Sequence, residues 1–135
     1  MLLTPKKSKF KKFHKNRLSR LDLKSNKLRF GSIGLQSIES GVLVSKQLES
    51  ARQAINRKIK RKGKIWIRVF PHFSITSKPT AVRMGKGKGP VTSWAAKIGK
   101  GSILFELDGI NLNLARLAFK TGSAKLPVKT KVICL

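Results

Sequence analysis

Positive charge is the feature that most limits what this chain can fold into. Thirty-one Lys and Arg residues face only five Asp and Glu over 135 residues, which gives a formal net charge of +26. Self-repulsion at this density opposes a compact state, so we expect an anionic partner to neutralise the chain. Nucleic acid is favoured, because each phosphate contacted by Lys or Arg releases condensed counterions. An anionic membrane is the alternative, but the basic residues run through the whole chain rather than along one amphipathic helix, so we expect no membrane partner.

The apolar content is high enough for a folded core. Hydrophobic residues make up 40% of the sequence, which separates the chain from disordered polar proteins, and the length suits one domain. No apolar run approaches the ~20 residues that span a bilayer. The single cysteine, Cys134, excludes an internal disulfide and a multi-cysteine zinc site. We interpret it as a small apolar residue at the end of a strand rather than as a reactive thiol.

Residues 1–30 form a basic stretch with no acid before Asp22. Phe10 and Phe13 are interleaved with its lysines, and nothing near them in the sequence suggests a core. Composition leaves three interpretations open: a solvated disordered tail, an organelle transit peptide or an arm that orders on RNA. Pro5 and the scattered lysines favour an extended arm over an amphipathic transit helix.

The rest of the sequence predicts strands and helices. Glycine-spaced apolar residues over positions 28–44 predict short strands and turns. A first helix is predicted from Ser45, as its N-cap, to about Lys62, with Gly63 as its C-cap. Its apolar residues recur at spacings of three and four and so share one face. They are Leu48, Ala51, Ile55 and Ile59.

Residues 64–70 alternate as a strand does, with odd-numbered apolar residues on one face. Residues 71–90 are predicted to be irregular, and residues 91–98 and 102–107 to form two strands joined by a hairpin at 99–101. A second helix over 111–125 and a last strand over 128–134 complete the pattern. We therefore expect an α+β fold, with two helices packed on a mixed or antiparallel sheet. Five aromatic residues are expected to pack in the core: Trp66, Phe70, Trp94, Phe105 and Phe119.

The sharpest local motif is Arg83-Met84-Gly85-Lys86-Gly87-Lys88-Gly89-Pro90. Alternating glycines let the backbone turn its N–H groups toward an anion, and the intervening lysines add charge. This combination suits close approach to a phosphate backbone, and a flexible solvated loop is the alternative. The spacing of a nucleotide-binding P-loop is absent.

Candidates for catalysis are few. His14 and His72 are each isolated in the sequence from any carboxylate or cysteine. Glu106 and Asp108 are interpreted as partners of neighbouring cations, or as shaping the turn at Gly109, rather than as an acid-base pair. No nucleophile with its base and no set of metal ligands stands out. We therefore predict no enzyme, no cofactor and no metal site; an rRNA-processing or rRNA-modifying accessory protein is the alternative.

Four stretches, in order and over nearly the whole chain, resemble the bacterial-type large-subunit ribosomal protein sixteen family. They are Pro5-Lys6-Lys7-Ser8-Lys9-Phe10 with His14-Lys15; residues 47–57; residues 63–71 with Lys78-Pro79 and residues 83–89; and residues 103–109 with Ala115-Arg116 and residues 124–127. Because the opening residues match the family's own start, the resemblance favours the RNA arm over the transit peptide. The preference for Lys over Arg and the sequence of residues 101–106 most resemble those of a mitochondrial member of the family. A plastid or bacterial ribosome is the alternative.

The resemblance implies an α/β-hammerhead-like domain over residues 28–135, a basic arm over residues 1–27 and a Gly-Lys loop over residues 76–90. It implies a structural constituent of the large ribosomal subunit that binds large-subunit rRNA and neighbouring ribosomal proteins. It also implies a role in shaping the aminoacyl-tRNA site near the peptidyl-transferase centre, beside aminoacyl-site and peptidyl-site tRNA. No homo-oligomer is expected.

The same resemblance, with the charge pattern, gives two sets of candidate site residues. The expected rRNA contacts are Lys6, Lys7, Lys9, Phe10, Lys11, Lys12, His14, Lys15, Arg17, Arg52, Arg57, Arg61, Lys64 and Arg68. The expected tRNA-side loop consists of Arg83, Met84, Gly85, Lys86, Gly87, Lys88 and Gly89.

Overall fold

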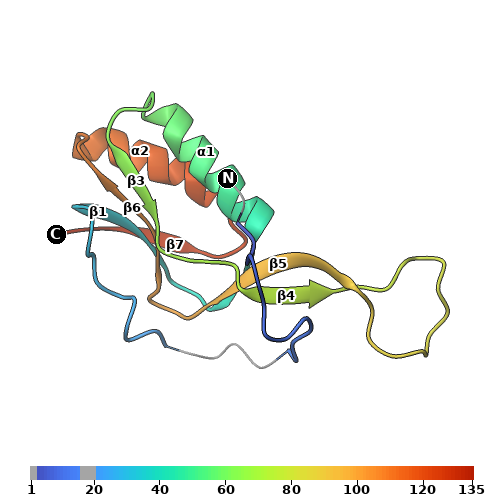
Figure 1. Ribbon diagram of the computed structural model, residues 1–135. Helices are drawn as coiled ribbons and strands as arrows, with labels where there is room; N and C mark the ends of the chain where they lie inside the picture. The colour runs from blue at the N-terminus through green and yellow to red at the C-terminus, as the bar shows by residue number, and fades with distance from the viewer. Residues whose placement is uncertain (1–2, 16–20) are drawn as a thin grey trace.

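The computed structural model describes residues 3–15 and 21–135. In this part the chain forms two helices and seven strands (Figure 1). In chain order they are β1 (Ile33–Ser37), β2 (Gly41–Val44), α1 (Ser45–Lys58), β3 (Lys64–Ile67), β4 (Phe73–Thr76), β5 (Val91–Ile98), β6 (Ile103–Asp108), α2 (Leu112–Ser123) and β7 (Thr130–Cys134). The α+β class predicted from the sequence is confirmed.

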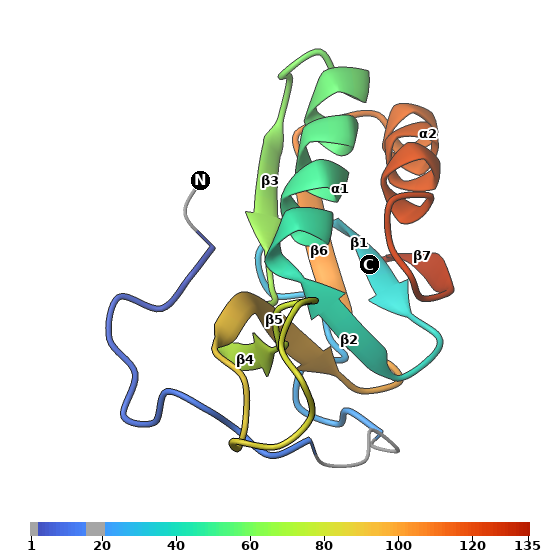
Figure 2. The ribbon, with the colours of Figure 1, turned by 90° about the vertical axis from the view of Figure 1, so that its right-hand side faces the viewer.

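The strands form two antiparallel sheets. The first has four strands in the order β3-β6-β1-β7, and the second has three in the order β2-β5-β4. Both helices cover the same face of the four-stranded sheet (Figure 2). β4 and β5 form a hairpin that extends away from the helices and the four-stranded sheet. The hairpin ends in the Gly-Lys loop, and residues 77–90 of this loop lie far from the helices (Figure 1).

The core lies between the helices and the four-stranded sheet. The apolar face predicted for the first helix is buried there, together with Phe105 of β6 and Phe119 of α2. Burying each large apolar side chain contributes ~1.5–3 kcal/mol. The helices pack closely because α2 carries Gly122, where an added Cβ would lie 2.6 Å from Cγ1 of Ile55. Neither helix within residues 3–15 and 21–135 combines the length and apolar character that crossing a membrane requires.

The ends predicted for the first helix are wrong at both sides. Its N-cap is Val44 rather than Ser45, because Val44 still pairs with β5 and its N–H donates to Oε1 of Gln47 at 2.9 Å. The helix ends at Lys58, since Lys60 and Arg61 adopt φ angles of 52° and 62°. Left-handed backbone cannot continue a right-handed helix.

Two strand predictions over residues 71–107 are also wrong. Residues 71–90 are not all irregular, because Phe73–Thr76 forms β4 against β5. β5 and β6 do not form a hairpin with one another, since each belongs to a different sheet. Gly101 crosses between the sheets with a φ of 92°. Its N–H donates to the carbonyl of Ser37 at 2.8 Å, and its own carbonyl accepts from Gln36 Nε2 at 2.7 Å.

Burial divides the five aromatic residues that were expected in the core. Phe105 and Phe119 are fully buried, as predicted. Trp66 and Trp94 are only half-buried, and Phe70 is 50% exposed, so the prediction is wrong for these three. Trp66 lies on the side of β3 that faces away from the core, since Ile65 and Ile67 pack against the core, and Phe70 follows the end of this strand.

Candidate nucleic-acid interface

The acidic residues of this chain are few, and the fold uses all of them internally. Each of the five has a hydrogen-bond or ion-pair partner in the described structure. Asp22 accepts from Ser102 at 2.6 Å, Glu39 pairs with Lys129 at 3.3 Å, Glu49 pairs with Arg52 at 2.6 Å, Glu106 pairs with Arg68, and Asp108 accepts from Ser32 at 2.9 Å. Residues 3–15 and 77–90 contain no acid at all. The positive charge of the arm and loop is therefore left for an external polyanion.

Glu106 is a buried carboxylate whose partners lie within the fold. Its side chain is fully buried, and Oε2 accepts from the N–H groups of Phe30 at 2.7 Å and Gly31 at 2.9 Å. Arg68 donates to Oε1. Burial alone would raise the pKa of Glu106, but the hydrogen bonds from Gly31, Phe30 and Arg68 outweigh it and hold this pKa below its usual range. The expected pairing of Glu106 with a cation is confirmed, and it leaves the Arg68 side chain only 11% exposed.

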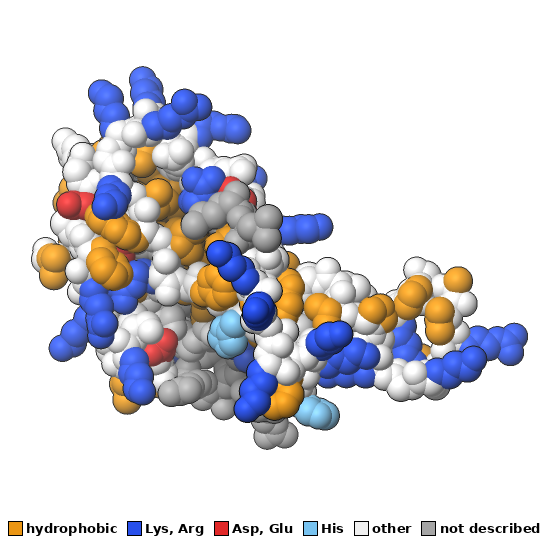
Figure 3. All heavy atoms as spheres, viewed as in Figure 1, with side chains coloured by type: hydrophobic (Ala, Val, Ile, Leu, Met, Phe, Trp, Pro, Cys, Tyr) orange, Lys and Arg blue, Asp and Glu red, His pale blue; other side chains and the backbone are white. Residues whose placement is uncertain are grey.

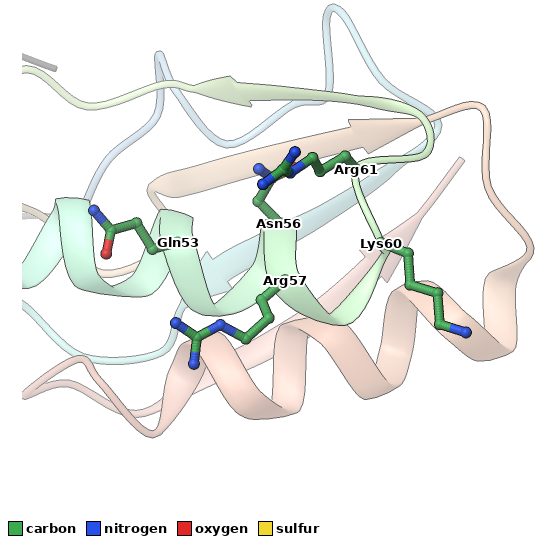
Figure 4. Close-up of a pocket in the computed structure, with 5 residues that line it drawn as sticks. All are labelled: Gln53, Asn56, Arg57, Lys60 and Arg61. Atoms are coloured by element: carbon green, nitrogen blue, oxygen red, sulfur yellow. The ribbon is translucent and has the colours of Figure 1, made fainter.

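The C-terminal end of α1 forms a cationic surface. Arg57 and Arg61, two of the expected rRNA contacts, line a pocket of about 470 Å³ together with Lys60 (Figure 4). In Figure 4 the side chains of Lys60 and Arg61 extend in different directions from the turn that follows α1. Figure 3 shows Lys and Arg side chains crowded at this end of the molecule. Lys60 was not among the candidates, although the basic run over positions 57–62 pointed to it.

Arg52 and Lys64 differ from that cluster because each already has an intramolecular contact. The hydrogen bond from Arg52 lowers the pKa of Glu49 to about 2 and raises the pKa of Arg52 itself. The ammonium of Lys64 lies 5.1 Å from the centre of the Trp66 ring. Both lie on α1 or β3, away from the Gly-Lys loop, and the start of the arm reaches α1, where Leu3 and Thr4 line a pocket together with Glu49.

The Gly-Lys loop is exposed from residue 81 to residue 88. Gly85 and Gly87 have φ angles of 102° and 77°, and a Cβ added at either would meet nothing within 4 Å. These two glycines therefore serve the backbone conformation and not close packing. Lys86 also adopts a positive φ, of 52°, and Met84 is 92% exposed. The tip of the loop thus exposes both its backbone and the side chain of Lys86.

The basic arm lies against the base of this loop. Nζ of Lys12 donates to the carbonyl of Lys88 at 2.7 Å, and Nζ of Lys88 donates to the carbonyl of Phe13. The rings of Phe13 and Phe73 are 5.7 Å apart between centroids, so Phe13 does have a partner in the fold. Figures 1 and 2 both show the arm passing beside the β4–β5 hairpin. No sequence signal linked these segments, which are about 75 positions apart.

The candidate residues therefore fall into two groups in space. The arm candidates are exposed and lie on the side of the loop; they are Lys6, Lys7, Lys9, Phe10, Lys11, Lys12, His14 and Lys15. Arg57 and Arg61 lie at the far end of α1, at the top of Figure 1. Arg17 lies outside the described residues. Within residues 3–15 and 21–135, no three His, Cys, Asp or Glu side chains are grouped as a metal ion would require.

The chain is similar to known proteins over nearly its full length. The model of a family described as ribosomal protein L16p/L10e matches residues 5–133. The large ribosomal subunit protein uL16 of Psychrobacter cryohalolentis is 52% identical over 132 residues, which cover 98% of this chain and 96% of that protein. The uL16 proteins of Buchnera aphidicola subsp. Cinara cedri and Bartonella henselae are 54% and 48% identical, over 96% and 98% of this chain and 94% and 96% of their own lengths.

Proposed function

This chain belongs to the ribosomal protein L16p/L10e family, and from that premise we propose that it is a structural constituent of the large ribosomal subunit which binds large-subunit rRNA and helps to shape the aminoacyl-tRNA site. The observation that carries the proposal is the placement of charge. Each of the five acids has a partner within the fold, and three of them pair with a cation, whereas the arm over residues 3–15 and the Gly-Lys loop contain no acid.

The rRNA contacts are assigned to two surfaces. One is the arm over residues 3–15, together with Arg17; the other is the end of α1 around Arg57 and Arg61, with Lys60 added. Exposed lysines and arginines can contact phosphates without breaking an intramolecular ion pair, because none of those in the described structure has a carboxylate partner on these two surfaces. Arg52, Lys64 and Arg68 are secondary contacts in this proposal, since each already bonds or stacks within the body.

The Gly-Lys loop is assigned to the tRNA side. The β4–β5 hairpin holds it away from the body, and residues 81–88 are exposed. Glycines with positive φ let backbone N–H groups and lysines approach one phosphate chain from the same side. We assign Arg83, Lys86 and Lys88 to the aminoacyl-site tRNA, with the peptidyl-site tRNA as a neighbour.

The remaining assignments complete the proposal. Residues 1–27 act as an rRNA-binding arm and residues 28–135 as one ribosomal protein domain, bordered by other large-subunit proteins and without a second copy of the chain. The role is structural and needs no catalysis. A mitochondrial ribosome is proposed as the location because of the Lys-over-Arg bias, and the relatives named above, which are bacterial, make a bacterial ribosome the alternative.

The test is sedimentation of a cell or organelle lysate through a density gradient in moderate salt. We expect the protein in the fractions of the large subunit, and organelle fractionation beforehand shows which ribosome it joins. A chain with Lys86 and Lys88 changed to Ala should still sediment there while tRNA accommodation by those ribosomes is weakened. Protein that stays at the top of the gradient would overturn the ribosomal role; unchanged accommodation would overturn the position of the loop.

A further inference from the structure

A pocket of about 710 Å³ lies between the basic arm and the base of the Gly-Lys loop. Its lining combines basic and apolar residues. Three lysines, Lys11, Lys12 and Lys88, line it together with Ser8 and three apolar residues. The apolar residues are Pro90, Val91 and Trp94. Arm residues 3–15 and loop residues 77–90 contribute no acid that could neutralise these lysines.

We propose that this pocket receives one unpaired nucleotide of RNA, with its base against Trp94 and its flanking phosphates between the three lysines. The volume is in the range of small-ligand sites, ~300–1,000 Å³. An aromatic ring beside a row of cations is the arrangement by which proteins hold single-stranded nucleic acid. The inference rests on the RNA-binding function proposed above and adds to it a defined site.

Trp94 suits this role better than Trp66, the other half-buried tryptophan. The Trp66 ring is stacked by Phe30, with centroids 6.1 Å apart and an interplanar angle of 20°, and Lys64 lies 5.1 Å from its centre. In the described part of the chain no aromatic ring and no cation lies against Trp94 in this way. Trp94 therefore lines the pocket without a ring or cation partner among the described residues, whereas Phe30 and Lys64 already contact the Trp66 ring.

The site also joins two segments that were expected to work separately. Lys12 donates to the carbonyl of Lys88, and Lys88 donates to the carbonyl of Phe13. Two hydrogen bonds therefore link the arm to the Gly-Lys loop. A nucleotide bound between them contacts both segments at once. Its binding fixes the arm against the base of the loop, and rRNA held by the arm thereby limits the positions that the loop adopts.

A matched pair of full-length proteins tests the site through tryptophan fluorescence. Trp66→Phe leaves Trp94 as the single fluorophore, and Trp94→Phe leaves Trp66. Each is titrated with a five-nucleotide single-stranded RNA, and with the same oligonucleotide lacking its central base, which carries equal charge. We expect the intact RNA to quench Trp94 through stacking of its central base, the abasic RNA to quench it far less, and Trp66 to respond to neither.

Affinity gives a second readout. Lys12→Ala and Lys88→Ala should each weaken binding of the intact oligonucleotide several-fold, while Lys125→Ala, an exposed lysine on the other side of the fold, should not. Equal quenching by the intact and abasic RNA, or equal responses of Trp94 and Trp66, overturns the proposal. So does a Trp94 that ignores RNA but changes when large-subunit proteins are added, because the occupant is then a protein side chain.

Failure of this site and failure of the ribosomal role give different results. The same variants are sedimented with large subunits. If they enter the subunit while Trp94 is not quenched by RNA, the nucleotide site is wrong and the ribosomal role stands. If the unmodified chain does not enter the subunit, the ribosomal role itself fails.

Discussion

Two regions of this molecule, a helical body and a hairpin extension, differ in how their charged residues are arranged. The body consists of α1, α2 and the four-stranded sheet, and the extension consists of β4, β5 and the Gly-Lys loop with the arm beside it. The body contains the buried Glu106 carboxylate and the ion pair of Glu49 with Arg52. The extension has no acid from position 71 to position 98. The body thus supplies folding free energy, and the extension keeps its charge for binding.

Glycines show the same contrast. In the body, a Cβ at Gly63 would lie 2.5 Å from the carbonyl oxygen of Asp108, so the chain needs glycine for close approach. In the loop, a Cβ at Gly85 or Gly87 would meet nothing. Gly89, at the base of the loop, is packed like Gly63, because a Cβ there would lie 2.4 Å from the carbonyl oxygen of Ser77. Substitutions at the open tip of the loop should therefore separate stability from RNA binding.

Replacing Glu106 by Ala should cause the largest loss, about 3–5 kcal/mol, because it leaves the guanidinium of Arg68 without its buried partner. Urea denaturation measures the change. The matched control is Glu39→Ala, whose partner Lys129 is 80% exposed, and which should cost less than ~1 kcal/mol. Similar losses for the two variants would contradict the claim that the buried Glu106–Arg68 pair stabilises the fold more than the exposed Glu39–Lys129 pair does.

Replacing Gly63 by Ala should come second and cost about 2 kcal/mol or more, since its φ of 75° is added to the clash with Asp108. Gly87→Ala is the control in the loop. It has a similar φ of 77° but open space, so its strain is local and should leave thermal unfolding of the body nearly unchanged. If Gly87→Ala destabilises the body as much as Gly63→Ala does, the two regions are not independent.

The Glu49–Arg52 pair should give a smaller, pH-dependent effect. Because the folded pKa of Glu49 is lowered from 4.5 to about 2, its contribution to stability is complete above pH 4.5 and is lost as the pH falls toward 2. Denaturation at several pH values in this window should show a slope that Glu49→Gln reduces. Glu39→Gln, at an exposed pair, should leave the slope in place. An unchanged slope in Glu49→Gln would contradict the assigned pKa.

Loop cations should matter least for stability. Arg83→Ala with Lys86→Ala should change the free energy of unfolding by less than ~0.5 kcal/mol, because both side chains are exposed. RNA binding should respond instead, with the salt dependence of affinity decreasing by about one unit for each cation lost. Filter binding at several salt concentrations measures this slope. A normal slope together with lower stability would reverse the roles assigned to body and extension.

Much of the body could be predicted from the sequence because its signals are local. The second helix was predicted over residues 111–125 and is found at Leu112–Ser123, with Asn111 as the cap that accepts from the N–H of Asn113. β4 and the membership of the two sheets were missed, because they depend on pairs such as Gly41 with Ile98 that are distant in the chain. Four residues cannot show a reliable alternation by themselves.

The candidate site was predicted residue by residue but not as an assembly. Charge and glycine spacing identified the arm and the loop, and the structure finds residues 6–12 and 81–88 exposed, whereas Leu3 of the arm is buried in the core. Their contact through Lys12 and Lys88 could not be predicted, since it joins segments 76 positions apart and leaves no periodic pattern. The partial burial of Trp94 was likewise missed, because an aromatic residue in a strand is compatible with either a core or a surface position.

The central proposal is that the cations of the arm and the Gly-Lys loop, which have no acid within their own segments, contact RNA in the large subunit, whereas the exposed lysines on and after α2 do not. Lysine acetylation footprinting of purified large subunits carrying aminoacyl-site tRNA, compared with the free protein, tests it most directly. We predict that Lys11 and Lys86 become protected in the subunit, whereas Lys120 and Lys125, exposed on and after α2, stay reactive. Arm and loop lysines as reactive in the subunit as in the free protein would contradict the account.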